Sequence, residues 1–230
     1  MTITQEPQEI PTIIPVFPLT GSLLLPGNLL PLNIFEPRYR NMVADALAGS
    51  QHIGLIQPLV PRQDNWVAEA ESASQSHPEL YPIGCVGKID RSEQQPDGRY
   101  VIVLRGISRF RIVRELPMWR GYRQVEADYS AFPGDELEPA SLLNPARLLR
   151  ALRTFSETHG LEFDFDLLGS LPGVILLNGL AAALPFRPAE KQALLEAPGT
   201  LEREELLLTL MGMGLDTQSA DEYYSPPTVH

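Results

Sequence analysis

The feature that most constrains the fold is a change in the spacing of apolar residues near Phe132-Pro133-Gly134. Before it, short apolar runs are separated by proline and glycine, which is typical of β-strands and turns. After it, apolar residues recur every three or four positions, which is typical of amphipathic helices. The sequence therefore predicts an α+β fold, with a strand-rich part over residues 11–132 and a helical part over residues 136–214. We expect the acidic, proline-bearing residues 215–230 to be disordered.

The strand-rich part begins with the apolar run Ile13–Pro18, which contains two prolines. Because proline cannot donate a ladder hydrogen bond, we expect an edge strand, or a strand that pairs on one side only. Leu25-Pro26-Gly27-Asn28 predicts a turn, and Glu36-Pro37 predicts the start of a helix. Asp97-Gly98 predicts a hairpin turn, and Gly106 indicates a bulge or turn between two short strands. The expected strands are 13–18, 29–35, 52–57, 81–90, 100–104, 110–113 and 122–129, with a polar surface excursion over 58–82.

The helical part contains four expected helices, over 141–158, over 172–184, from 187 to about 197, and from 200 to about 213 with Thr200 as N-cap. Residues 167–186 carry no charge, which is about the length of a membrane-spanning helix. Glycine and proline interrupt this segment, and its uninterrupted part, Val174–Leu184, would rise only ~16 Å against ~30 Å of hydrocarbon. We therefore expect a buried core helix and no membrane partner.

Charge limits the classes of partner. The formal net charge is −11, which disfavours a general role in binding nucleic acid or anionic membranes. The segment from Gly84 to Val125 is the exception, with nine basic and four acidic residues. We interpret it as a solvated sheet face whose arginines pair with acidic residues elsewhere in the fold. The alternative is an RNA-binding face, on which Phe110, Trp119 and Tyr122 stack bases.

Few residues have the spacing that catalysis requires. An ATP-binding loop ends in Gly-Lys followed by serine or threonine, and neither lysine, Lys88 or Lys191, fits. We expect Lys191 to be solvated rather than the buried base of a Ser-Lys protease, and the single cysteine, Cys85, to be a core thiol. The histidines show no metal-ligand spacing. The acidic residues at 162, 164 and 166 predict a loop before a helix, with a hard-cation site as the alternative. We expect no catalytic residue, no metal and no cofactor.

One window carries a resemblance to a known family. The run I-P-V-F-P-L-T-G-S-L-L-L-P-G-N-L-L-P-L-N-I-F-E-P-R-Y, residues 14–39, resembles the opening of the N-terminal domain of Lon proteases. P-D-G-R-Y at 96–100, R-G-I-S-R-F at 105–110 and L-P-F-R-P-A-E-K at 184–191 are similar to later parts of that domain. The motif positions are Pro26, Gly27, Pro31, Phe35, Glu36, Pro37, Arg38, Tyr39, Gly106 and Phe110. The resemblance implies a PUA-like pseudo-barrel of mostly antiparallel strands, followed by a helical bundle.

The resemblance also implies a function. In Lon proteases this domain recognises unfolded substrate, so we expect a non-catalytic module that binds client polypeptides, in protein quality control or as an adaptor. The partners would be unfolded polypeptides and a protease or motor. The alternatives are an RNA-binding PUA-like protein and an accessory subunit of an ATP-dependent protease. The lone cysteine and the absence of a visible signal peptide predict a cytoplasmic location.

Such a module needs an apolar groove, an unpaired strand edge and a few charges. We predict surface contacts at Trp66, at the surrounding excursion and at the bulge residues Arg105, Arg109 and Arg111. We expect Phe35 and Tyr39 to be core residues, and Glu36 and Arg38 to have a structural role at the start of a helix.

Overall fold

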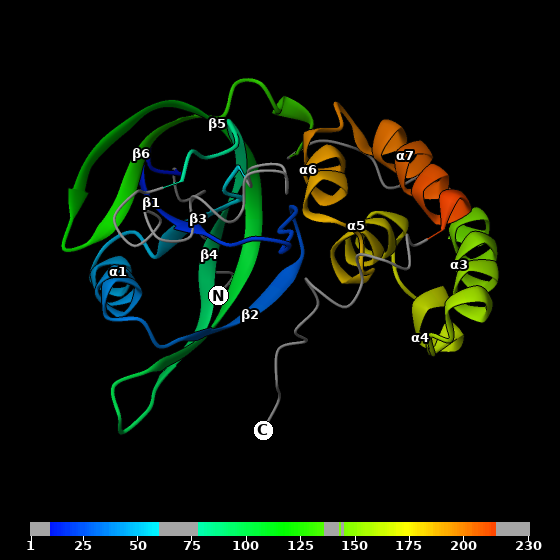
Figure 1. Cartoon of the computed structure of the whole chain (residues 1–230), viewed down its shortest axis with the longest axis horizontal. Helices are drawn as coiled ribbons and strands as arrows, with labels where there is room; N and C mark the ends of the chain where they lie inside the picture. Colours follow the sequence, from blue (N-terminus) through cyan, green and yellow to red (C-terminus); the bar gives the residue numbers. More distant parts are fainter. Residues whose placement is uncertain (1–9, 60–77, 136–142, 144, 215–230) are drawn as a thin grey trace, which may run out of the picture.

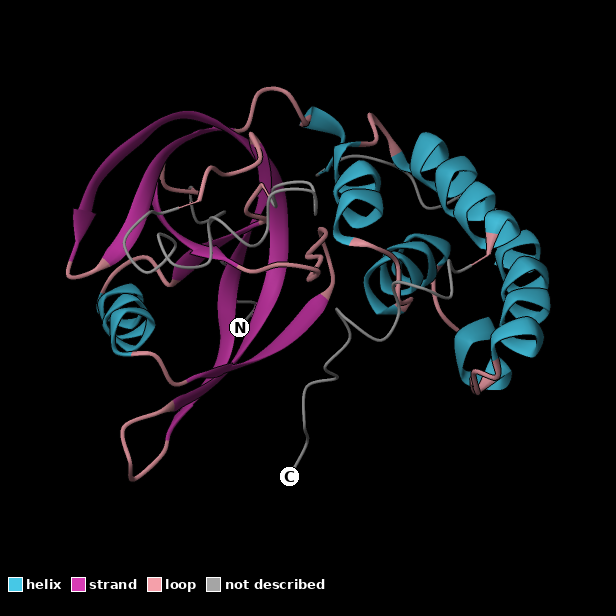
Figure 2. Ribbon diagram, in the orientation of Figure 1, coloured by secondary structure: helices cyan, strands magenta, loops and turns pink. Residues whose placement is uncertain are grey.

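The computed structural model describes residues 10–59, 78–135, 143 and 145–214. The strands wrap into a barrel-like layer, and most of the helices pack together on one side of it (Figures 1 and 2). The elements are β1 (Ile13–Pro18), β2 (Leu29–Ile34), α1 (Pro37–Ala48), β3 (His52–Ile56), β4 (Ile83–Gln94), β5 (Tyr100–Trp119), β6 (Tyr122–Asp128), the 3-10 turn η2 (Pro133–Asp135), α3 (Pro145–His159), α4 (Phe165–Gly169), α5 (Gly173–Ala183), α6 (Pro188–Glu196) and α7 (Thr200–Met213). The predicted α+β class is confirmed.

The sheet closes on itself through its longest strand. The six strands are ordered β2-β5-β4-β3-β1-β6, and β5 also pairs with β6. One edge of β5 pairs with β4, while the other pairs first with β2 and then with β6. All pairings are antiparallel except β1 with β3. The arrangement is the mostly antiparallel pseudo-barrel that the family resemblance implies.

Strand β1 is not the edge strand that its prolines predict. Its first residues pair with β6, with Ile13 opposite Glu126, and its last residues pair with β3, with Pro18 opposite Ile56. Each neighbour uses only part of the strand, so that a proline can stand where no ladder bond is required. The expectation of one-sided pairing was therefore wrong.

Strand β5 replaces the two short strands expected around Gly106. The register shifts between Val86–Ser108 and Gly87–Gly106, which leaves Ile107 as the extra residue of a bulge. The bulge bends the strand without ending it. A Cβ on Gly106 would lie 2.1 Å from the carbonyl oxygen of Leu25, so the close approach of the 25–28 turn requires glycine here.

The turns and the first helix form where the sequence predicts them. Gly27 has a φ of +82° and the amide of Asn28 donates to the carbonyl of Leu25, which closes the predicted turn. The hairpin between β4 and β5 turns at Gly98, also at φ +82°. Helix α1 starts with Pro37 at its first position, where no amide donor is needed.

Helix α5 is the apolar helix that the sequence assigns to the core, and Leu176, Leu177 and Ala181 on it are buried. No helix within the described residues is long and apolar enough to cross a membrane. Helix α7 begins one residue earlier than expected, because Gly199 is its N-cap and Thr200 already lies in the helix.

The helical part and the barrel share one hydrophobic cluster, which contains Leu24 and Cys85 on one side and Leu176 and Leu194 on the other. Polar bonds add to it at α6. The buried amide of Gln57 donates to the carbonyl of Pro188 at 2.9 Å and to Gln192 Oε1 at 3.2 Å, and Gln192 donates to the carbonyl of Ile83 at 3.1 Å. Helix α6 therefore contributes to fixing the helical part to the barrel.

Candidate polypeptide-binding surface

The outer face of β2 and β5 exposes apolar side chains. In a sheet, residues that are opposite each other across a pair point to the same face. Pro31 lies opposite Val103 and Asn33 opposite Val101. Leu29 is 53% exposed and Val101 38%, and Phe35, one residue beyond β2, is 64% exposed. We call Leu29, Pro31, Phe35, Val101 and Val103 the apolar sheet face.

The outer edge of β2 borders this face. Among the described residues β2 pairs with β5 alone. The amide of Gly106 donates to the carbonyl of Asn28, and hydrogen-bonded and non-bonded pairs alternate along an antiparallel ladder. Leu29 and Asn33 therefore direct their backbone N–H and C=O groups to the outer edge, together with the carbonyl of Pro31. An extended chain can pair with these groups, and only Pro31 lacks a donor.

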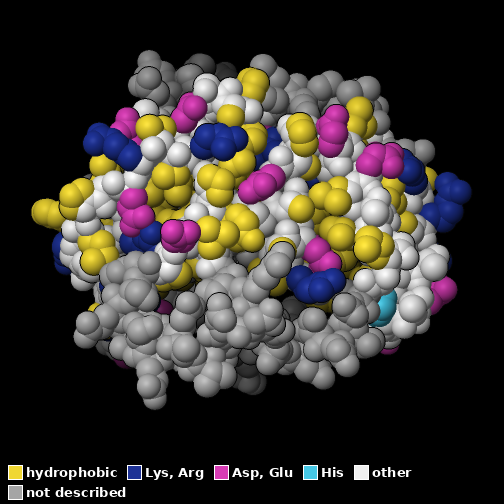
Figure 3. Space-filling view, turned by 45° about the horizontal axis from the view of Figure 1, so that its top comes forward, with side chains coloured by type: hydrophobic (Ala, Val, Ile, Leu, Met, Phe, Trp, Pro, Cys, Tyr) yellow, Lys and Arg dark blue, Asp and Glu magenta, His cyan; other side chains and the backbone are white. Residues whose placement is uncertain are grey.

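Apolar exposure alone does not identify a site on this protein. Figure 3 shows one face of the molecule, on which hydrophobic side chains lie in separate islands between acidic and basic ones. Such scattered exposure is ordinary for a protein surface. The apolar sheet face differs because its residues share one sheet face and adjoin a strand edge that can form hydrogen bonds.

Arg105 stands at one end of the apolar sheet face. It lies opposite Leu29, and its guanidinium donates to Asp90 from Nε at 3.0 Å and from Nη2 at 2.8 Å. Both side chains are partly exposed. The structure thus brings one predicted contact residue, Arg105, together with two positions of the family motif, Pro31 and Phe35.

Arg109 is not the surface contact that the sequence predicts. Its side chain is 2% exposed and pairs with Asp135, which is 5% exposed, at 2.8 Å. The guanidinium also donates to the carbonyls of Leu195, Ala197 and Pro198, at the end of α6. The prediction was wrong because charged residues are buried when such partners satisfy them. Arg109 is a connection between the barrel and the helical part.

The other predicted contacts do not meet at this face. Arg111 is exposed on β5, but it lies opposite Ile83 and Asp128, away from β2. Trp66 and most of the predicted excursion are outside the described residues, as is the predicted tail 215–230. Their contribution to binding stays a prediction.

Two aromatic motif residues have different environments. Tyr39 is buried on α1, with its ring centroid 4.4 Å from that of Phe17, as expected of a core residue. Phe35 was also expected in the core, but it is exposed because β2 ends at Ile34 and α1 begins at Pro37. The family motif therefore contains both core and surface positions.

Several of the remaining motif residues make structural contacts. Glu36 is the N-cap of α1 without a side-chain cap bond, and it accepts a bond from Arg38 Nε at 2.9 Å. Phe110 is fully buried, and the carbonyl of Pro26 accepts a bond from Asn178 on α5 at 3.1 Å.

Most arginines of the basic segment pair with acidic residues, as the sequence analysis favoured. Besides the two pairs described, the structure contains Arg114–Glu126 at 2.5 Å, Arg123–Glu115 at 2.6 Å, and an ion pair between Arg120 and Asp45. These carboxylates offset the positive charge that would attract an RNA backbone.

Two buried residues, Cys85 and Lys191, have shifted pKa values that burial explains. Burial raises the pKa of the Cys85 thiol, which fits a core residue. Lys191 is buried, not solvated as expected, and its Nζ donates to the carbonyl of Ala182 near the end of α5 at 2.9 Å. Burial lowers the pKa of Lys191 to about 8.

Metal-binding side chains do not gather in the described part of the chain, where no group of three or more His, Cys, Asp or Glu residues could hold an ion. Of the acidic residues at 162, 164 and 166, Asp164 caps α4 by accepting bonds from the amides of Asp166 and Leu167. This is the acidic loop before a helix that the sequence predicts.

Sequence reasoning missed Leu29 and Val101. Both lie in strands whose apolar residues occupy consecutive positions, and the strand period alone does not say which set faces the core. The sequence did contain a signal, because apolar residues occupy both faces of the strands in 29–34 and 100–104. A strand with one solvated face would alternate apolar and polar residues.

Comparison with known proteins places the chain in a family. A family model described as the ATP-dependent protease La (LON) substrate-binding domain matches residues 13–212. The Lon protease of Flavobacterium johnsoniae is 26% identical over 220 residues, which are 93% of this chain and 25% of that protein. The Lon protease of Desulfovibrio desulfuricans is 30% identical over 211 residues, 88% of this chain and 22% of that protein. The chain thus spans about a quarter of the length of these curated relatives.

Solved structures agree with this. A Lon N-terminal domain protein from Xanthomonas campestris has a TM-score of 0.56 at 26% identity, over 87% of this chain and 99% of that one. The N-terminal domain of a Mycobacterium avium complex Lon protease has a TM-score of 0.60 at 21% identity, over 88% of this chain and 100% of that one, which shows the shared fold. The similarity supports a substrate-recognition module. The chain belongs to the LON substrate-binding domain family.

Proposed function

We propose that this protein binds unfolded polypeptide segments by strand addition at the outer edge of β2. The segment would pair with the backbone groups of Leu29 and Asn33 and place alternate side chains over the apolar sheet face. The observation that carries the proposal is the exposure of Leu29, Phe35 and Val101 beside a strand edge that pairs on one side only within the described residues. The match to a substrate-binding domain supports it.

The expected affinity is low, and the expected exchange is fast. Covering a half-exposed large apolar side chain contributes about 1 kcal/mol, so the three residues contribute about 3 kcal/mol together. The edge bonds add about 1 kcal/mol each, and ordering the bound segment costs a comparable amount. Binding in the high micromolar to millimolar range corresponds to roughly 4–6 kcal/mol. Such binding suits repeated capture and release of many sequences.

The proposal is tested with reduced, carboxymethylated α-lactalbumin as the unfolded polypeptide, labelled with fluorescein and followed by anisotropy. The double variant Leu29→Ser, Phe35→Ser should weaken binding about tenfold or more, since about 1.4 kcal/mol is a factor of ten. The matched control is Val113→Ser, because Val113 is 59% exposed at the other end of β5 and outside the apolar sheet face. Equal binding by the double variant and the control would show that the face is not the site.

The proposed role is recognition without catalysis, in protein quality control or as an adaptor that hands clients to a protease or motor. ATP hydrolysis and peptide cleavage by the full-length relatives are not assigned to these residues. Incubation of the purified protein with unfolded casein should therefore leave the casein intact. Casein fragments that persist after repeated purification would contradict the non-catalytic part of the proposal.

A further inference from the structure

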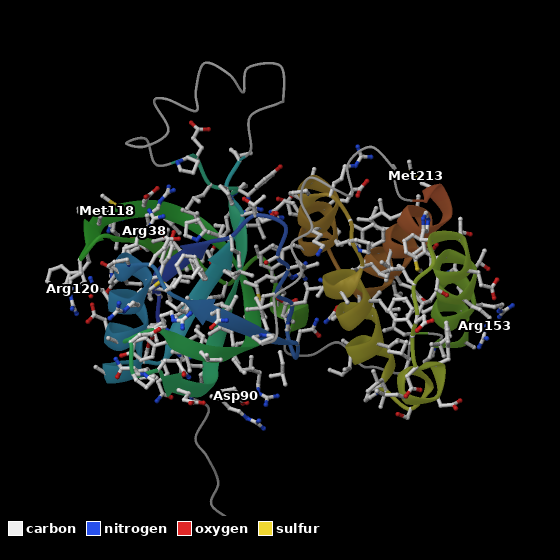
Figure 4. The ribbon with its side chains drawn as sticks, turned by 60° about the horizontal axis from the view of Figure 1, so that its bottom comes forward. Arg38, Asp90, Met118, Arg120, Arg153 and Met213 are labelled. Carbon is white, nitrogen blue, oxygen red and sulfur yellow. The ribbon has the colours of Figure 1, made fainter. Side chains whose placement is uncertain are left out.

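A small pocket lies on the barrel away from the apolar sheet face. Its volume is about 160 Å³, and it is bounded by the end of β1, the first turn of α1 and the start of β6. Figure 4 shows Arg38, at this pocket, and Asp90, beside Arg105, on opposite sides of the barrel. The pocket and the apolar sheet face are therefore separate surfaces that can be tested independently.

The pocket combines cationic and apolar walls. Arg38, Tyr39, Tyr122 and Arg123 contribute to it together with prolines, and the described residues that line it include no acidic side chain. The guanidinium carbon of Arg38 lies 4.6 Å from the centroid of the Tyr39 ring. Burial raises the pKa of Tyr39, Arg38 lowers it, Glu36 raises it and Arg123 lowers it. A carboxylate that displaces Glu36 would meet the guanidinium of Arg38 and the N–H groups of Arg123 that do not bind Glu115 or Pro78, with which it can form charge-assisted hydrogen bonds.

The two arginines differ in exposure and in their partners. Arg123 is 8% exposed and is held by Glu115 at 2.6 Å and by the carbonyl of Pro78 at 2.6 Å. Arg38 is 45% exposed and pairs with Glu36, which is 40% exposed. Exposed pairs of this kind contribute little to stability, so that a ligand carboxylate can replace Glu36 at low cost. Arg123 provides a fixed charge and Arg38 an exchangeable one.

The first turn of α1 adds to the positive potential. The N-cap side chain of Glu36 makes no cap bond, and the first turn contains no acidic residue. The amides at a helix start carry a partial positive charge that favours anions. Arg38 and Tyr39, which contribute to the pocket wall, belong to this turn.

The volume limits what can bind. Pockets for drug-sized ligands and cofactors start at about 300 Å³, whereas 160 Å³ holds roughly five waters at ~30 Å³ each. A carboxylate together with a small apolar side chain has this size. A lone acidic side chain in the middle of a chain would leave part of the pocket empty, and it would have to bring two continuing strands of backbone to the rim.

We propose that this pocket binds the C-terminal residue of a polypeptide, with the terminal carboxylate on Arg38 and Arg123 and a small apolar side chain against the prolines. The two arginines in the pocket wall carry this assignment, because Arg38 can exchange its exposed partner Glu36 while Glu115 holds Arg123 in place. It rests on the proposed function, because it defines a class of polypeptide that the module selects. Trp119, which is 57% exposed and lies opposite Tyr122 of the pocket wall, extends the surface for the residues that precede the terminus.

The test uses three fluorescein-labelled hexapeptides. One is Gly-Ser-Gly-Ser-Ala-Val with a free carboxylate, the second is the same sequence as a C-terminal amide, and the third is the amide of Gly-Ser-Gly-Ser-Ala-Asp. None has a large apolar side chain that the apolar sheet face would bury. The free acid should bind about tenfold more tightly than either amide at low salt, and the preference should shrink in 0.5 M NaCl. Equal binding of the acid and its amide would overturn the proposal, as would equal binding of the aspartate peptide and the free acid.

Matched variants on α1 locate the effect. Arg38→Gln should reduce the preference for the free acid to threefold or less, because one of two guanidinium groups is lost. Arg40→Gln should keep it, since Arg40 lines a different hollow with Asn41 and Tyr100. An unchanged preference in Arg38→Gln would overturn the proposal. The double variant Leu29→Ser, Phe35→Ser should also keep the preference, so that failure of the apolar sheet face and failure of the pocket give different results.

Discussion

Replacing Arg109 by methionine tests whether a buried ion pair connects the barrel to the helical part. Arg109 Nη2 lies 2.8 Å from Asp135 Oδ1, and Nε lies 3.0 Å from both carboxylate oxygens. The same guanidinium donates to the carbonyls of Leu195 at 2.9 Å and Pro198 at 3.3 Å, and to that of Ala197. Methionine has a similar length and no charge, so that the change removes the bonds and keeps most of the packing volume.

The expected loss follows from the burial of both partners. Removing one partner of a buried, hydrogen-bonded pair costs about 3–5 kcal/mol, because the other charge stays in a medium that solvates it poorly. Solvent screening does not reduce this value much, since the two side chains are only 2% and 5% exposed. We expect Arg109→Met to lower the free energy of unfolding by about 4 kcal/mol. The double variant Arg109→Met, Asp135→Asn should recover about half of that loss, because no charge is then buried alone.

Urea denaturation followed by far-UV circular dichroism measures these values. The matched control is Arg114→Met, because Arg114 pairs with Glu126 while 67% exposed and should cost less than about 1 kcal/mol. The dependence of the unfolding free energy on urea should be unchanged if the same surface is exposed. A loss in Arg109→Met as small as that in Arg114→Met would refute the assigned role of the pair, and no recovery in the double variant would refute the electrostatic reason.

Three further predictions follow from other described contacts. Lys191 has a folded pKa of about 8, below that of the unfolded chain, so the unfolded state binds more protons and stability should rise between about pH 8 and 10.5. Relative to Lys191→Met, measured by denaturation across this range, the wild type should gain up to about 3 kcal/mol; a flat difference would contradict the burial of a charged lysine. Gly106→Ala should lower the melting temperature, because its Cβ would meet the backbone of Leu25, whereas Gly179→Ala, which meets nothing within 4 Å, should stabilise α5 by about 0.5–1 kcal/mol. Heparin at low salt should not retain the protein, since the basic segment pairs with its own carboxylates, and retention would favour the RNA-binding alternative.

Local features of the fold could be predicted from the sequence because local physics determines them. A positive φ requires glycine at Gly27 and Gly98, and a proline at the first helical position marks the start of α1 at Pro37. The apolar composition of α5 predicts burial whatever its neighbours are. These features depend on residues within one or two turns of each other.

The features that the sequence predicted wrongly depend on partners far along the chain. An arginine in an alternating strand resembles a solvated residue, and the acceptors that bury Arg109 come from Asp135 and from the end of α6. Lys191 is buried by the end of α5, and Pro15 is tolerated because β3 and β6 divide β1 between them. The candidate site has the same limitation, because the outer edge of β2 is identified only when the strand order is known.

The closure of the sheet also determines when the chain can fold during synthesis. Strand β1 pairs with β6, so that Ile13 meets Glu126, and β2 pairs with β5, so that Leu29 meets Arg105. A ribosome that has released only the first hundred residues would hold β2 without β5, and β1 with β3 but without β6. Strand β2 therefore stays unpaired until β5 has emerged, and the barrel cannot close until β6 has emerged. During that interval the apolar residues of β2 resemble the unfolded segments that we propose this protein binds.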